Sequence, residues 1–176
     1  MKKIGIEIKW ASIITTFYCI WAYIENATGN HKDFSNIIIF GLLFFLIIIV
    51  MSIMAFFDKK MNFYESKWDF KQAFRFGLFL TGITALLNPI AHYITYNSIS
   101  PEYFTNLIEY QAAKGRETKE VLEKTYNFDS SMYQSMRDIL SFGIVFSAVL
   151  AYFLKTKNYT SPVKTVELKS KKKKKL

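Results

Sequence analysis

The chain has 176 residues and a formal net charge of +9, and it is 51% hydrophobic and 18% aromatic. A single soluble domain of this length cannot bury so much apolar surface, so the composition excludes an ordinary soluble globule and predicts a membrane protein. Cys19 is the only cysteine, which excludes an intramolecular disulfide and a cysteine metal cluster.

Four apolar segments are expected to cross a membrane as helices. Residues 34–57 and 76–101 carry no charged side chain over 24 and 26 residues, more than the roughly 20 that a spanning helix needs. Residues 10–24 and 139–154 form shorter runs, but amphipathic side chains flank them and can reach the interface. A cleaved signal peptide is the rival interpretation of the first run, although IENATGN offers a poor cleavage site. The predicted spans are about 9–29, 34–57, 74–98 and 132–154.

The segment between the third and fourth spans predicts a helical hairpin outside the membrane, at about residues 100–128. Ser100, Pro101 and Glu102 make a helix start, with an N-cap, a proline in the first turn and an early acid. Gly115 then breaks this helix, and ETKEVLEKTY predicts a second, charged one. The predicted organisation is an all-α four-helix transmembrane domain, residues 1–157, followed by a disordered lysine-rich cytoplasmic tail, residues 158–176.

The distribution of basic residues predicts the orientation of the chain. If both termini are cytoplasmic, 17 of the 23 Lys and Arg residues lie inside and six lie outside. The positive-inside rule therefore favours a multi-pass protein with both ends in the cytoplasm. The tail is expected to meet anionic headgroups before nucleic acid, although topogenic charge alone also explains it. The lysines expected to contact anionic lipid are Lys169, Lys171, Lys172, Lys173, Lys174 and Lys175.

Two polar stripes run along predicted spans, each with residues spaced by three or four. The stripe on the third span comprises Thr81, Thr84, Asn88, His92 and Thr95. The stripe on the first span comprises Ser12, Thr16, Cys19, Tyr23 and Asn26. Because polar faces are costly toward lipid, we expect the two stripes to face each other as an internal polar seam. Span four adds a ridge of small residues, typical of close helix packing, formed by Gly143, Ser147 and Ala151.

His92 follows the helix-kinking Pro89 and allows two interpretations. It is either a proton-sensitive or ligand-contacting group, or a neutral imidazole that bonds another helix near the outer interface. We favour the second interpretation because the span ends soon afterwards in the polar sequence YNSIS. No acidic residue lies within the four uncharged runs, which lowers the prospect of a proton-coupled exporter.

Three segments, DFKQAFRFGLFLTGI, SPEYFTNLIEYQAAKGRETKEVLEK and GIVFSAVLAYFLKTK, occur in this order and resemble the domain of unknown function 4199 family. The resemblance covers roughly residues 70–157. It implies a small four-span protein of the bacterial inner membrane with no established activity, and no catalytic residues to carry over.

Known enzyme motifs are missing from the sequence: it has no glycine-rich phosphate loop, no Gly-x-Ser-x-Gly and no His-Glu-x-x-His. We therefore expect a non-enzymatic protein without catalytic, cofactor-binding or metal-binding residues. The first functional hypothesis is an accessory or scaffold subunit of an envelope process. The alternative is a small transporter, or a protein that moves a lipid or polyprenyl carrier along the seam. The expected partners are the bilayer and either a second copy of the chain or an envelope protein, and not nucleic acid.

Overall fold

The structure is a computed structural model that describes residues 4–115 and 117–159. Within this part of the chain every regular element is a helix, which confirms the all-α prediction. The long helices are α1 (Gly5–Ala27), α3 (Ile37–Phe63), α4 (Phe70–Ile94) and α7 (Phe128–Leu154). The short ones are α2 (Asn30–Asp33), the π-helix η1 (Thr95–Ile99) that continues α4, α5 (Tyr103–Ala113) and α6 (Lys119–Thr125).

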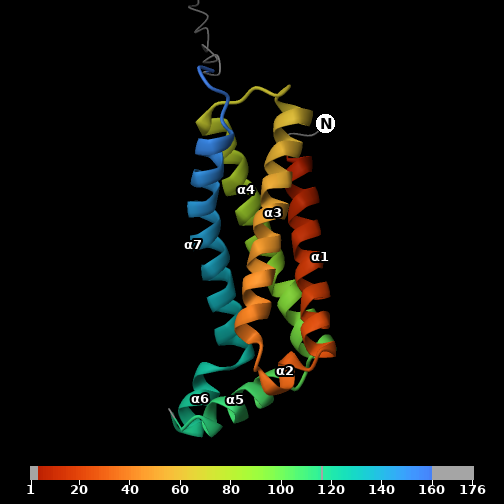
Figure 1. Ribbon diagram of the computed structural model, residues 1–176, viewed down its shortest axis with the longest axis vertical. Coiled ribbons are helices and arrows are strands. Elements are labelled where there is room, and N and C mark those ends of the chain that lie inside the picture. Colours follow the sequence, from red (N-terminus) through yellow and green to blue (C-terminus); the bar gives the residue numbers. More distant parts are fainter. Residues whose placement is uncertain (1–3, 116, 160–176) are drawn as a thin grey trace, which may run out of the picture.

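The four long helices lie side by side in an elongated bundle (Figure 1). α2, α5 and α6 gather at one end, here called the connector end. The start of α1, the α3–α4 connection and the end of α7 lie at the opposite, terminal end. α4 packs against α7 and α1, whereas α3 and α7 touch at few positions. Polar side chains on α4 are therefore enclosed by two neighbours.

Three helices are long and apolar enough to cross a membrane: Ile37–Phe63, Phe70–Ile99, which joins α4 and η1, and Phe128–Leu154. They contain the third and fourth predicted spans and all but the first three residues of the second. α1 is not among them, because Glu7, Lys9 and several hydroxyl side chains lower its mean hydropathy. The chain is thus shown to have membrane-like helices, and a crossing by α1 is taken up below as a proposal.

α4 begins four residues before the start predicted for the third span. Asp69 accepts a hydrogen bond from the Gln72 amide at 2.8 Å, and the Gln72 side chain accepts one from the Asp69 amide at 3.0 Å. This reciprocal capping box satisfies two amides that the first turn would leave unpaired. The basic connection before α4 is accordingly shorter than the sequence predicted.

Close packing between α4 and α7 depends on two glycines. A Cβ added to Gly143 of α7 would overlap the side chain of Thr81, and one added to Gly77 of α4 would overlap Ser147. Ser147 and Ala151 are buried. The three small residues predicted as a packing ridge thus lie on α7, with two of them directly against α4.

The terminal end holds the densest core and a buried ion pair. Trp68 is fully buried and donates from its indole nitrogen to the Leu154 carbonyl at 2.9 Å, which caps the end of α7. Glu7 of α1 and Lys59 of α3 pair at 2.9 Å, with side chains only 5% and 2% exposed. Because α1 is weakly hydrophobic, this pair supplies a specific contact that fixes it to α3.

The connector between η1 and α7 contains two short helices that contact each other, α5 and α6. Gly115 follows α5 with φ +67°, which confirms that this glycine ends the helix, since only glycine adopts this region freely. α7 is capped by Asn127, whose side chain accepts from the Ser130 amide at 2.9 Å. The lysines predicted to contact lipid, and the tail from residue 160 onward, lie outside the described residues.

Candidate functional site

A cavity of about 670 Å³ lies within the bundle, bounded by α4 and α7 on one side and by α3 on the other. α1 contributes Tyr18, and α5 contributes Tyr103 and Leu107 at the connector end. The volume falls within the roughly 300–1,000 Å³ of small-molecule binding sites. The space is therefore large enough for a ligand.

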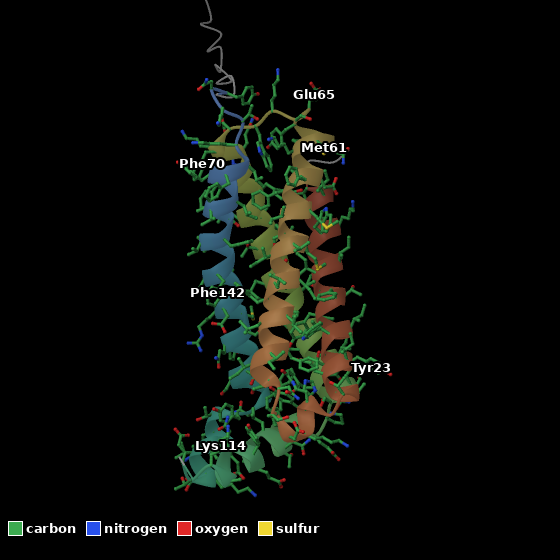
Figure 2. The ribbon with its side chains drawn as sticks, in the orientation of Figure 1. Tyr23, Met61, Glu65, Phe70, Lys114 and Phe142 are labelled. Carbon is green, nitrogen blue, oxygen red and sulfur yellow. The ribbon has the colours of Figure 1, made fainter. Side chains whose placement is uncertain are left out.

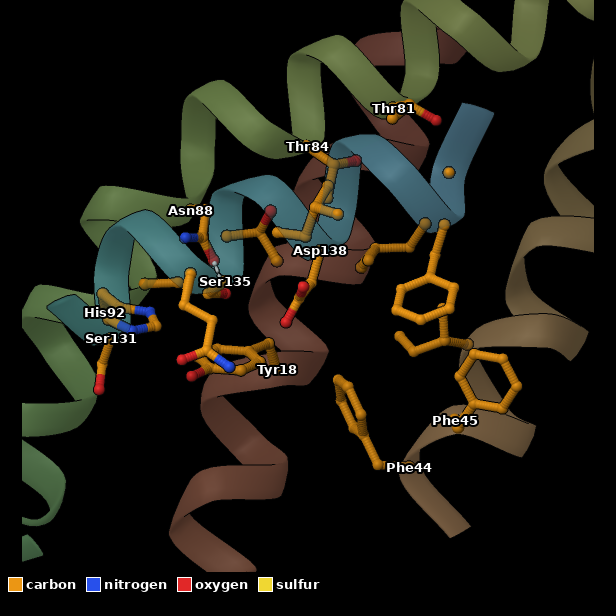
Figure 3. A pocket seen from close by; sticks show the side chains of 18 of the residues that line it. Tyr18, Phe44, Phe45, Thr81, Thr84, Asn88, His92, Ser131, Ser135 and Asp138 are labelled. Atoms are coloured by element: carbon orange, nitrogen blue, oxygen red, sulfur yellow. Dashed lines mark hydrogen bonds between the residues drawn. The ribbon is translucent and has the colours of Figure 1, made fainter. Parts of the chain in front are cut away.

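One wall of the cavity is polar and is built by α4 and α7 (Figure 3). Ser135 of α7 donates a hydrogen bond to Asn88 Oδ1 of α4 at 3.2 Å. Asn88 is 5% exposed, and its amide nitrogen has no partner among the described residues. A buried donor left unpaired costs about 1–3 kcal/mol, which a polar ligand group or water would recover.

His92 lies one turn beyond Asn88 and is enclosed by aromatic rings. Its imidazole stacks on Tyr18 of α1, with ring centroids 6.1 Å apart and planes within 8°. The rings of Tyr96 and Phe128 meet it edge to face, with ring centroids 4.9 and 6.2 Å from that of the imidazole. The residue is 2% exposed; its ring meets the backbone of Ser131 on α7, although neither nitrogen lies in regular hydrogen-bond geometry. The hydrogen bond to another helix stays a prediction, with Ser131 as its candidate partner.

Asp138 brings a carboxylate into the same cavity from α7. Figure 3 shows its side chain directed into the space that Tyr18 and Phe44 face. It lies ten residues inside α7, about 15 Å from the first residue at 1.5 Å per residue, within a helix apolar enough to span a membrane. An ionisable residue at such a depth marks a functional site by default.

The opposite wall belongs to α3 and is mainly apolar, with Phe44, Phe45, Ile48 and Ile49; Ser52 adds one hydroxyl. Phe45 and Phe142 of α7 meet edge to face with ring centroids 6.4 Å apart. Both rings line the cavity, yet they are 49% and 64% exposed on the bundle surface. The cavity is therefore accessible sideways, between α3 and α7, where a surrounding bilayer would be.

Three tyrosines close the connector end of the cavity. The hydroxyl of Tyr96 is hydrogen-bonded with those of Tyr18 and Tyr103. Tyr96 belongs to η1, and π-helical turns often occur at functional sites. Burial raises the pKa of Tyr103 far above its usual value, so its hydroxyl keeps its proton. The cluster is a rigid, neutral hydrogen-bonding group.

A second space of about 100 Å³ adjoins these tyrosines. Glu25 and His31 line it, with Glu25 Oε2 3.4 Å from His31 Nε2. His31 Nδ1, Trp21 Nε1 and Thr95 Oγ1 are buried there without hydrogen-bond partners in the described residues. Several unpaired polar atoms around a small polar space are the usual setting of ordered water.

Comparison with known proteins identifies the family. The family described as protein of unknown function, DUF4199, matches residues 9–156, most of the chain. The chain belongs to the DUF4199 family. No curated protein and no solved structure matches it. The match extends the predicted resemblance through the first two helices and carries no activity with it.

In this DUF4199 protein the polar stripe of α4 lies where the sequence predicted an interior. Thr81, Asn88, His92 and Thr95 are buried, and Thr84 is partly buried and lines the cavity. The stripe therefore forms the cavity wall and the contact with α7.

The polar stripe on α1 does not face the polar stripe on α4. The prediction that the two stripes form one internal seam is therefore wrong. Ser12 and Thr16 are exposed, Cys19 is partly buried, and Tyr23 is 62% exposed and points away from the other helices (Figure 2). α1 instead turns its apolar face inward, with Ala11, Ile14 and Ala22 buried. Asn26 alone bonds across, donating to the Ile99 carbonyl at 2.7 Å.

Sequence reasoning missed the polar contribution of α7. Ser131, Ser135 and Asp138 recur at intervals of four and three, so they form a stripe on one helix face. This signal was present in the sequence. Treating Asp138 as the boundary of an uncharged run concealed it, because α7 starts ten residues earlier.

Proposed function

We propose that this DUF4199 protein is a non-enzymatic protein of the bacterial cytoplasmic membrane that binds an amphipathic lipid in the cavity between α3, α4 and α7. The observation that carries the proposal is that a polar wall and an apolar wall face each other across the same cavity. The α4–α7 wall has buried polar atoms without partners, whereas the α3 wall is mainly apolar, with Phe44 and Ile48 and the single hydroxyl of Ser52, which bonds the Ile48 carbonyl. Such a space fits a molecule with a polar head and a hydrocarbon tail.

The polarity of the cavity also changes along the bundle axis. The ionisable and amide groups Asn88, His92 and Asp138 lie toward the connector end. Toward the terminal end the lining is apolar apart from hydroxyls, with Leu80 and Phe146 beside Thr81 and Ser147. A bound lipid would place its head near α5 and its tail toward the middle of the bundle. Entry would occur between α3 and α7, where the helices touch least.

We further propose that α1 is a fourth span and that both termini are cytoplasmic. Support comes from its 23 residues, about 35 Å of helix, which exceeds the roughly 30 Å of a hydrocarbon core. Its charged residues near the terminal end are paired, Glu7 with Lys59 and Lys9 with Asp58. With this orientation the connector end is exterior, and the lipid head faces the outer leaflet.

The sequence left two hypotheses, an accessory or scaffold subunit and a protein that moves a lipid. This proposal favours the second. A scaffold has no need of a lateral cavity with unpaired buried donors. Ser131, His92 and Asp138 are residue types found in catalytic triads. The contact of His92 with Ser131 is to its backbone, however, whereas nucleophilic catalysis requires a hydrogen bond between the base and the side chain of the nucleophile. The present geometry therefore supports binding rather than covalent catalysis.

Photo-crosslinking tests the proposal. The protein in lipid nanodiscs would be irradiated with a trace of a diazirine-bearing fatty alcohol, with and without excess unlabelled alcohol. Thr84→Phe should fill the cavity and remove the saturable labelling, whereas Leu86→Phe should not, because Leu86 lies on α4 outside the cavity and is 74% exposed. Equal saturable labelling of both variants, or only non-saturable labelling of the wild type, would overturn the proposal.

A further inference from the structure

We infer that the lipid bound in the cavity carries a cationic head, an amine or quaternary ammonium group, and that Asp138 is its counter-ion. The inference rests on the proposed function and goes beyond it by assigning the charge class of the ligand. It starts from the charges that face the cavity.

The formal charge of the cavity lining is negative. Asp138 is the one carboxylate among the lining residues, and no lysine or arginine is among them. Arg137, its neighbour in sequence, does not line the cavity. A phosphate or carboxylate head would therefore enter next to a like charge and without a basic partner, which disfavours it.

The carboxylate of Asp138 has no partner within the described chain that would stabilise its charge. It forms no ion pair and no hydrogen bond with the described part of the chain. Asp138 is exposed on the surface of the bundle, within a helix apolar enough to span a membrane. A carboxylate at such a place is costly without a counter-charge, and such groups usually pair with another charge. A cation in the cavity would provide that charge.

Aromatic rings around the same end of the cavity suit a cation as well. Tyr18, Phe44, Tyr103 and Tyr126 all line it, and π faces attract alkylammonium groups. Glu25 lies beyond the tyrosines and acts electrostatically on Tyr18 and Tyr103, so it adds to the negative potential there. The neutral Ser135–Asn88 pair can bond hydroxyl or ester groups of the same lipid.

A head-group series tests the inference on the wild-type protein. Dodecyltrimethylammonium, dodecyl maltoside and dodecyl phosphate would compete, below their micellar concentrations, with the diazirine alcohol in nanodiscs. We expect the cation to compete at least about tenfold better than the neutral head, and the anion to compete worst, since a charge pair in a partly dry cavity is weakly screened. To remove the bulk-membrane contribution, each compound's partitioning into empty nanodiscs is measured and subtracted.

Two matched variants assign the preference to one residue. Asp138→Asn should abolish the cation preference, while Asp129→Asn, an acid on the same helix outside the cavity, should retain it. Equal competition by cation and neutral head in the wild type, or an unchanged preference in Asp138→Asn, would refute the inference and leave lipid binding intact. Failure of every competitor, including unlabelled alcohol, would instead refute the proposed function.

Discussion

The buried ion pair between Glu7 and Lys59 should be the most sensitive site in the fold. The two side chains are 2.9 Å apart and almost fully buried, with Lys59 4.1 Å from the ring centroid of Phe63. Replacing Lys59 with Met keeps the length of the side chain but leaves the Glu7 carboxylate buried without its partner. We expect Lys59→Met to loosen α1 from α3 and to destabilise the whole bundle.

The magnitude follows from the burial of both groups. Removing one member of a buried pair typically costs about 3–5 kcal/mol, because the remaining charge is uncompensated. For a protein of this size that corresponds to a fall in melting temperature of about 6–20 °C. Replacing both members, Glu7→Leu with Lys59→Met, should recover most of the loss, since a packed apolar pair is often as stable as a buried ionic one.

Thermal unfolding of the purified protein in one detergent would measure all three variants. Lys9→Met is the matched control: Lys9 pairs with Asp58 at 2.7 Å, but its side chain is 55% exposed, so the loss should stay below about 1 kcal/mol. If Lys59→Met melts like Lys9→Met, or if the double variant is no better than the single one, the reasoning from burial is refuted.

Three further predictions concern packing, orientation and the tail. Gly143→Ala should cost about 1–3 kcal/mol in thermal unfolding because its methyl would overlap Thr81, whereas Gly41→Ala should cost little because no atom lies within 4 Å of that Cβ. In a cysteine-free background on intact spheroplasts, an impermeant thiol reagent should label a cysteine at Lys119 and not one at Lys157; the reverse pattern would invert the topology. A soluble fusion of the tail should bind anionic vesicles at low salt and lose binding on deletion of residues 169–176; equal binding to neutral vesicles would contradict a headgroup contact.

Much of the fold was predictable because membrane helices are coded by long uncharged runs, which residues 34–57 and 76–101 supply. The interior position of Asn88 and His92 was predictable too, because polar residues spaced by three and four on an apolar helix are costly toward lipid. These features follow from local sequence. They require no knowledge of which helices are neighbours.

The pairing of stripes failed because spacing alone does not tell which neighbour a polar face meets. A hydroxyl can return its hydrogen bond to a carbonyl four residues earlier, as Ser52 does with Ile48 at 2.7 Å and Thr84 with Leu80 at 2.9 Å. Ser and Thr are therefore tolerated on faces toward lipid. Ser12 and Thr16 are exposed on the outer face of α1, so their spacing carried no information about α4.

The sequence argued against coupled transport because the uncharged runs contain no acidic residue, and Asp138 supplies such a residue. Within the proposed function, we still favour a protein that holds a lipid over one that passes a lipid across the membrane. The cavity runs from the connector end past the middle of the bundle and stops at Phe56, beyond which Trp68 and Phe76 belong to the packed core of the terminal end. A head bound near Asp138 would have to cross that core to reach the other side. The Glu7–Lys59 pair holds α1 to α3 at the same level, so opening a path there would require breaking a buried ion pair. The proposed lipid binding is therefore best pictured as lateral withdrawal of a lipid from one leaflet followed by its retention.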